Sequence, residues 1–86
     1  MPDYAITFAR SARKELDALG EPLASRVFAR IEALAGDPRP AGCRKLQGSQ
    51  DLWRIRVGEY RVVYSVSDAA RTVDVSIIRH RSGVYR

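Results

Sequence analysis

The segment from Asp51 to Tyr64 constrains the fold most, because apolar and arginine residues alternate along it with period two. Such alternation indicates a β-strand with one buried face and one open face. In its middle, Gly58-Glu59 fits a two-residue turn with glycine first, as a type II′ turn prefers. The resulting hairpin would pair Val57 with Tyr60, Ile55 with Val62, Trp53 with Tyr64 and Arg56 with Arg61.

Arginines occupy the open face of this predicted hairpin. Arg56 would lie opposite Arg61, with Arg54 two residues from Arg56 on the same face. Like charges directly opposite each other destabilise paired strands. A chain that keeps three cations on one face is therefore expected to hold an anionic ligand there. Trp53 and Tyr64 fall in the apolar phase and are expected in the core.

Positive charge is concentrated in the second half of the chain. Residues 1–38 carry five Lys/Arg against six Asp/Glu, whereas residues 39–86 carry ten against four, for a formal net charge of +5. Such asymmetry indicates a polyanionic partner, either nucleic acid or an acidic protein. A basic surface without a specific partner is the simpler alternative, and the hairpin arginines weigh against it.

The remaining pattern predicts a single α+β domain over residues 1–86, in the order β-α-α-β-β-β. Strands are expected at Asp3–Phe8, in the hairpin from about Leu52 to Val66 and at Thr72–Arg79, with helices at about Arg10–Leu19 and Pro22–Ala35. The helices would form an antiparallel hairpin packed on one face of a small four-stranded sheet. Arg39–Asp51, rich in proline, glycine and polar residues, is predicted to be a loop.

Composition favours a cytoplasmic protein without a membrane partner. The chain is 45% hydrophobic, as globular proteins are, but has no apolar run of membrane-spanning length and opens with no signal peptide. Its only cysteine, Cys43, is expected to be a loop thiol, because a lone cysteine builds neither a disulfide framework nor a cysteine-based metal site.

Five segments carry a resemblance that extends over essentially the whole chain. They are Tyr4-x-Ile-x-Phe-x-x-x-Ala12-x-x-x-Leu16, Ile31-x-x-Leu34-x-x-Asp37-Pro38, Lys45-Leu46-x-Gly48, the hairpin Trp53–Tyr64 and His80-Arg81-x-x-Val84-Tyr85-Arg86. In this order and spacing they resemble the RelE/ParE superfamily of bacterial toxins. The C-terminal motif is more similar to the RelE branch than to the ParE branch.

The resemblance implies a toxin of a bacterial toxin–antitoxin system that is a metal-independent endoribonuclease and uses no cofactor. RelE-type toxins cut mRNA in the ribosomal A site, where the 2′-hydroxyl attacks the adjacent phosphate and leaves a 2′,3′-cyclic phosphate. The resemblance also implies a cognate antitoxin, acidic, partly disordered and encoded by an adjacent gene. Toxin and antitoxin would form a hetero-oligomer that contacts DNA only through the antitoxin.

The family's motifs also suggest site residues. For catalysis these are Arg61, Arg81, Tyr85 and His80, and for RNA binding Arg54, Arg56 and Lys45. Arginine offers a permanently charged fork for phosphate oxygens and for the extra charge of a pentacoordinate phosphate. Tyr85 would stack on a base or orient the 2′-hydroxyl, although a role as a core anchor for the C-terminus is the alternative.

The chain departs from well-known family members, which have lysines at the positions of Arg54 and Arg56. An arginine pKa lies above about 12, so these residues can stabilise charge but cannot transfer protons. His80, the only histidine, is a natural acid or base near neutral pH, with a surface histidine at a strand end as an equal alternative.

The phase of the last predicted strand raises a difficulty for Arg81. Val73, Val75 and Ile77 are expected to face the core, which puts Arg81 in the same inward phase. It would reach the open face only if the strand ends or bulges before it. Two other functions stay open: a ParE-like toxin that inhibits DNA gyrase by protein contact, and a catalytically weak relative that only binds antitoxin.

Overall fold

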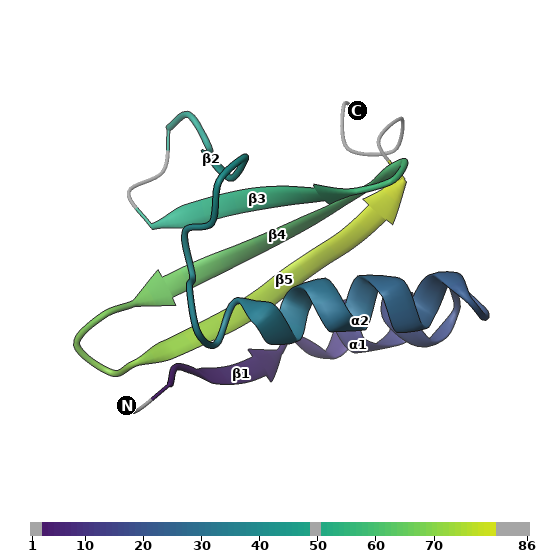
Figure 1. Cartoon of the computed structure of the whole chain (residues 1–86), viewed down its shortest axis with the longest axis horizontal. Helices are drawn as coiled ribbons and strands as arrows, with labels where there is room; N and C mark the ends of the chain where they lie inside the picture. Colours follow the sequence, from purple (N-terminus) through teal and green to yellow (C-terminus); the bar gives the residue numbers. More distant parts are fainter. Residues whose placement is uncertain (1–2, 49–50, 81–86) are drawn as a thin grey trace.

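One mixed β-sheet and a pair of helices form the two layers of the molecule (Figure 1). The computed structural model describes residues 3–48 and 51–80. Its elements are β1 (Ala5–Phe8), α1 (Arg10–Asp17), α2 (Leu23–Ala33), β2 (Arg44–Lys45), β3 (Leu52–Val57), β4 (Tyr60–Ser67) and β5 (Thr72–His80). The strand order is β1-β5-β4-β3-β2, with β1 parallel to β5 and the other pairs antiparallel. The α+β class predicted from the sequence is confirmed.

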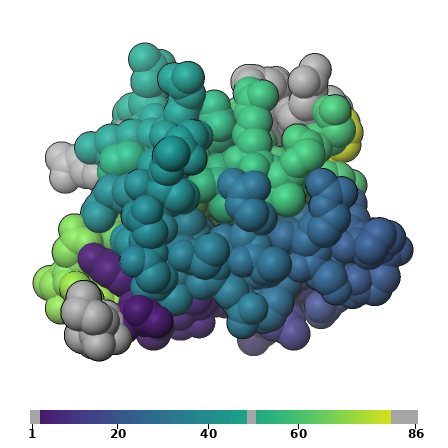
Figure 2. Space-filling model, viewed as in Figure 1, coloured from purple at the N-terminus to yellow at the C-terminus, as the bar shows by residue number. Residues whose placement is uncertain are grey.

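The predicted four-stranded sheet is wrong, because the sheet has five strands. The added strand, β2, lies within the segment predicted to be a loop and places Arg44 opposite Arg54. A two-residue strand is too short to show alternation in the sequence, so only its pairing with β3 reveals it. Figure 2 shows the segment around β2 lying beside the β3–β4 hairpin and α2 on one face of the molecule.

The two helices pack on the sheet through apolar residues spaced four apart. The α1 helix buries Ala12 and Leu16 and contacts β5, while α2 buries Val27 and Ile31 and contacts β3. Between them Gly20 has a φ of +75°, a left-handed conformation that glycine adopts without the cost of a Cβ clash. The predicted helix hairpin is confirmed, although both helices end earlier than predicted.

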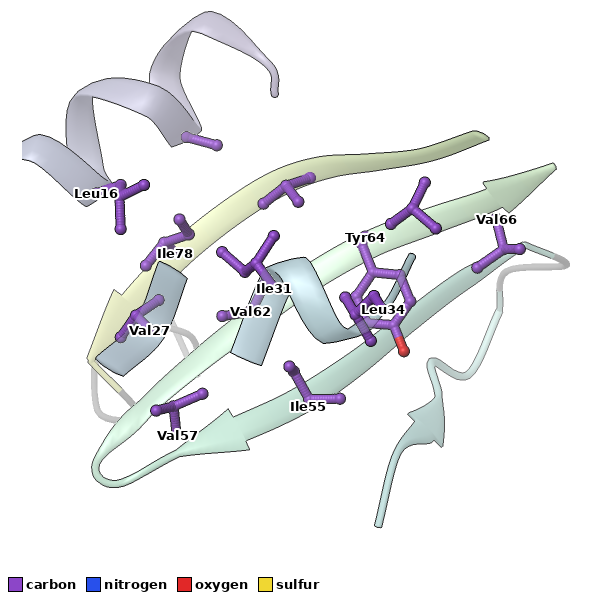
Figure 3. Packing of buried hydrophobic residues seen from close by; sticks show 13 residues of the cluster. Leu16, Val27, Ile31, Leu34, Ile55, Val57, Val62, Tyr64, Val66 and Ile78 are labelled. Atoms are coloured by element: carbon purple, nitrogen blue, oxygen red, sulfur yellow. The ribbon is translucent and has the colours of Figure 1, made fainter. Parts of the chain in front are cut away.

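The core lies between the helices and the sheet, and Tyr64 is its largest fully buried side chain (Figure 3). The Tyr64 hydroxyl donates a 2.7 Å hydrogen bond to the carbonyl oxygen of Pro38, at the end of the helical layer. Burial is the main cause that raises the pKa of Tyr64. The predicted core position of Tyr64 is confirmed, and Trp53 packs against the core while partly exposed.

A β-bulge interrupts the pairing of β4 with β5. Val63 lies opposite Ile77, whereas Tyr64 lies opposite Val75, so Ser76 is an extra residue on β5. A bulge changes which face the following residues present. Ile77 therefore shares the face of Val63, away from the helices, and its expected place in the core is wrong.

Candidate nucleic-acid interface

The hairpin register predicted from the sequence is confirmed at every predicted pair. Trp53 lies opposite Tyr64, Ile55 opposite Val62, Arg56 opposite Arg61 and Val57 opposite Tyr60. The turn follows from Gly58, whose φ is +61°, because the first residue of a type II′ turn takes a positive φ. Local sequence therefore fixes which residues share the face that carries the arginines.

Three arginines form a row across three strands on the sheet face away from the helices. Arg56 on β3 lies opposite Arg61 on β4, which lies opposite Arg79 on β5. Residues directly opposite in antiparallel strands have Cβ atoms about 4.5–5.5 Å apart, so this register brings three cations together. We call Arg56, Arg61 and Arg79 the arginine row. The position of Arg79 in this row was not predicted, because only the bulge at Ser76 puts its side chain on the same face as Arg61.

Arg61 differs from the rest of the row in its burial. Its exposed fraction is 6%, and among the described residues it is the only charged residue that is buried. The expectation that all three hairpin arginines lie on an open surface is therefore wrong for Arg61, although its strand register is as predicted. Burial removes most of the water that would otherwise screen the charge of this guanidinium.

A carboxylate from α1 holds the end of the row at the edge of β5. The Nε of Arg79 donates to Glu15 Oε2 at 2.8 Å, and the backbone N–H of Ile78 donates to Glu15 Oε1 at 2.9 Å. Glu15 therefore accepts a hydrogen bond from a backbone N–H at the edge of β5 and also fixes the side chain of Arg79. A guanidinium has five N–H donors, so Arg79 keeps donors for another anion.

A cleft of about 630 Å³ opens beside β3, next to the start of β2. Four arginines line it together with Ala41, Gly42 and Ile55: Arg30 from α2, Arg44 from β2, and Arg54 and Arg56 from β3. We call this the arginine cleft. The segments that supply it lie side by side in Figure 2. Among residues 3–48 and 51–80, none of these four arginines makes an ion pair.

The charges in the cleft repel one another. Desolvation, then the neighbouring charges of Arg56 and Arg44, lower the pKa of Arg54. An arginine stays protonated at neutral pH despite such a shift, so the repulsion remains in the folded protein. An anion bound between these side chains would relieve it. Arg30 and Arg44 were not predicted, since one lies on a helix of the less basic half and the other on the unpredicted β2.

Two predicted site residues lie on the other side of the sheet from the arginine row. Lys45 lies opposite Trp53, with its Nζ 6.0 Å from the centre of that ring. His80 lies opposite Tyr60 and makes an edge contact with its ring at 5.4 Å between centroids. Side chains alternate between faces along a strand, so His80 points to the face opposite that of Arg79.

The other predicted catalytic residues, Arg81 and Tyr85, lie outside the described residues. Within the described part of the chain, no group of three His, Cys, Asp or Glu side chains is placed to hold a metal ion. No helix there is both long enough and apolar enough to cross a bilayer. The described site is therefore built from cationic side chains, which can bind phosphates and stabilise negative charge.

Comparisons with known proteins give toxins that bear two names, ParE and RelE. Residues 6–85 match the family described as the ParE toxin of type II toxin-antitoxin system, parDE. A curated relative from Methanocaldococcus jannaschii, named "Putative toxin RelE1", is 34% identical over 59 residues, which span 65% of this chain and 66% of the relative.

Solved structures of similar fold include RelE toxins. The archaeal RelE–RelB complex from Pyrococcus horikoshii OT3 contains a chain that superposes with a TM-score of 0.81 at 27% identity, over 92% of this chain and 96% of that one. The isolated RelE toxin of E. coli gives a TM-score of 0.80 at 30% identity, over 95% of this chain and 90% of that one.

Proposed function

Since the chain belongs to the RelE/ParE superfamily and is a RelE-like toxin of a toxin–antitoxin system, we propose that it cleaves mRNA in the ribosomal A site. The observation that carries the proposal is the arginine row, in which three cations lie opposite one another across three strands. Guanidinium groups arranged in this way can bind a phosphate between them, and Arg79, although it is paired with Glu15, keeps donors for it.

The proposed reaction is an internal transfer at one phosphate. The 2′-oxygen forms a bond to phosphorus while the bond to the 5′-oxygen of the next nucleotide breaks, which leaves a 2′,3′-cyclic phosphate. The 2′-hydroxyl loses a proton, and the departing 5′-oxygen gains one. The pentacoordinate phosphate carries extra negative charge in the transition state, and we assign its stabilisation to Arg61 and Arg56.

Proton transfer falls to other groups. Arginine cannot act as a general base at neutral pH, and the register puts His80 beside Tyr60 on the opposite face. We therefore assign charge stabilisation to the row and leave the protons to water or to the ribosome. Arg81 and Tyr85 complete the proposed site through the resemblance alone.

An acidic antitoxin is the proposed partner. Structures of similar fold include RelE–RelB complexes, and the charge of this chain is +5 with the excess in residues 39–86. An acidic protein that covers the basic surface would block access of RNA to it. The two would form a hetero-oligomer whose DNA contacts come from the antitoxin.

Brief induction of the toxin without antitoxin, followed by mapping of mRNA 5′ ends, tests the proposed function. We expect new 5′ ends in phase with codons, confined to translated regions. The matching family model bears the ParE name, so gyrase inhibition is the competing outcome. Intact mRNA together with arrested replication and trapped gyrase–DNA complexes would overturn the proposal.

A further inference from the structure

The arginine cleft lies beyond the arginine row, around the edge of β3. Arg56 belongs to both, and Arg54 lines the cleft from the same strand. Arg44 lies opposite Arg54 on β2, and Arg30 reaches the cleft from α2. We propose that this cleft binds the phosphate backbone of the RNA at nucleotides next to the one that is cut.

The first argument is the charge of the cleft. Four arginines line it, no carboxylate does, and no ion pair engages any of the four within the described ranges. Arg30 and Arg44 are exposed, so their charges face the solvent from which a ligand would enter. Arginine forks bind phosphate oxygens with two parallel hydrogen bonds, so the cleft can hold a phosphate.

The second argument is size and continuity, and it favours RNA over an acidic protein segment. The cleft volume of about 630 Å³ leaves room for a sugar or a base beside a phosphate. Ile55 and Ala41 add apolar surface on which a sugar or base can lie. Because Arg56 is shared, one nucleic-acid strand can cross the row and continue into the cleft.

The inference rests on the proposed function for the identity of the anion, so its test measures binding without cleavage. The probe is a fluorescein-labelled 12-nucleotide RNA with 2′-O-methyl groups throughout, which lacks the attacking hydroxyl. Fluorescence anisotropy gives Kd over a range of salt concentrations. For single strands the slope of log K against log salt changes by about 0.7 for each phosphate contact that is lost.

We expect Arg30→Gln and Arg44→Gln each to weaken binding several-fold and to flatten the slope by about 0.7. Arg44→Lys should keep the slope while binding more weakly than the wild type, since the charge stays and the fork is lost. Arg10→Gln is the matched control: it removes one exposed arginine from α1, which packs on β5. Its slope should equal that of the wild type.

Equal slopes for the Arg30, Arg44 and Arg10 variants would overturn the inference. So would unchanged RNA binding in variants that lose affinity for a glutamate-rich peptide, because the cleft would then serve an acidic protein. The result is separable from the proposed function. If codon-phased cuts occur but the salt slopes of the variants and the control are equal, only the inference about the cleft fails. If those slopes differ but mRNA stays intact in cells, only the proposed cleavage fails.

Discussion

Arginines at two regions of the molecule have opposite surroundings. Beside the β4–β5 turn, Arg39 forms an ion pair with Asp68 at 2.9 Å, and the Tyr4 hydroxyl donates to the same carboxylate at 2.6 Å. In the arginine cleft, at the β3 edge, four arginines lie together and none has a carboxylate partner within the described residues. One chain thus pairs its cations in one region and leaves them to repel in another.

The difference separates an arginine with a carboxylate partner, such as Arg39, from the cleft arginines, whose donors are available to a ligand. Exposed ion pairs contribute only about 0–1 kcal/mol, so a carboxylate near Arg54 would improve stability modestly. It would also compete with an incoming phosphate for the same hydrogen-bond donors. Among the described residues no carboxylate lines the cleft, so the donors of its arginines stay available to an anion.

The largest expected effect is on the arginine row. Arg61→Ala should lower mRNA cleavage by about 10²–10³-fold, as loss of one transition-state donor does in other enzymes. Growth after induction measures activity, and copurification of the antitoxin shows that the variant is folded. An Arg61→Ala protein that still binds antitoxin and still arrests growth fully would show that the row has no catalytic part.

The double substitution Arg54→Gln, Arg56→Gln should separate activity from stability. We expect cleavage to fall by about 10-fold or more, because two phosphate contacts are lost. The free energy of unfolding should stay within about 0.5 kcal/mol of the wild type or rise, since repulsion is removed at exposed or half-buried positions. Urea unfolding measures it, and a clear loss of stability would mean that these arginines serve the fold.

His80→Gln should have a small effect. A general acid or base contributes about 10²–10⁴-fold to a rate, whereas we expect a change within about threefold, because His80 contacts Tyr60 on the face opposite Arg79. The measurement is the pH profile of cleavage. If the variant loses one limb of the wild-type profile, His80 is the proton carrier after all.

Asp68→Asn should affect stability alone, and only at some pH values. Hydrogen bonds from Arg39 and then Tyr4 lower the pKa of the Asp68 carboxyl below its usual value. A lowered pKa means that the ionised form stabilises the fold above the unfolded pKa, and this contribution is lost as the pH falls through the folded pKa. Urea unfolding at pH 6 and at acid pH should thus show a deficit of the variant that shrinks on acidification, with cleavage unchanged.

Local patterns predicted the parts of the molecule that depend on neighbours in sequence. Alternation gave every pair of the β3–β4 hairpin, and four-residue spacing gave the faces of both helices. The bulge at Ser76 could not be predicted, because it depends on how β5 packs against β4. Because of that single residue, Arg79 lies on the face of Arg61 and His80 on the opposite face.

The arginine cleft also lay beyond sequence reasoning. Arg30 and Arg44 are 14 positions apart in the chain and meet only because α2 and β2 both reach the edge of β3. The strand that carries Arg44 has two residues, so its formation depends on β3 as a template. The basic half of the chain did indicate a polyanion, but not where it binds.

Single-turnover cleavage of mRNA in the A site of purified ribosomes compares the two kinds of arginine most directly. Arg56→Gln removes a cation without a carboxylate partner in the described chain, and Arg13→Gln removes one that lies 3.6 Å from Asp17 on an exposed helix face. We predict that the rate of the Arg56 variant falls by about 10-fold, because a phosphate contact is lost. The rate of the Arg13 variant should be unchanged. Equal rates for the two variants would contradict the assignment of the unpaired arginines to RNA.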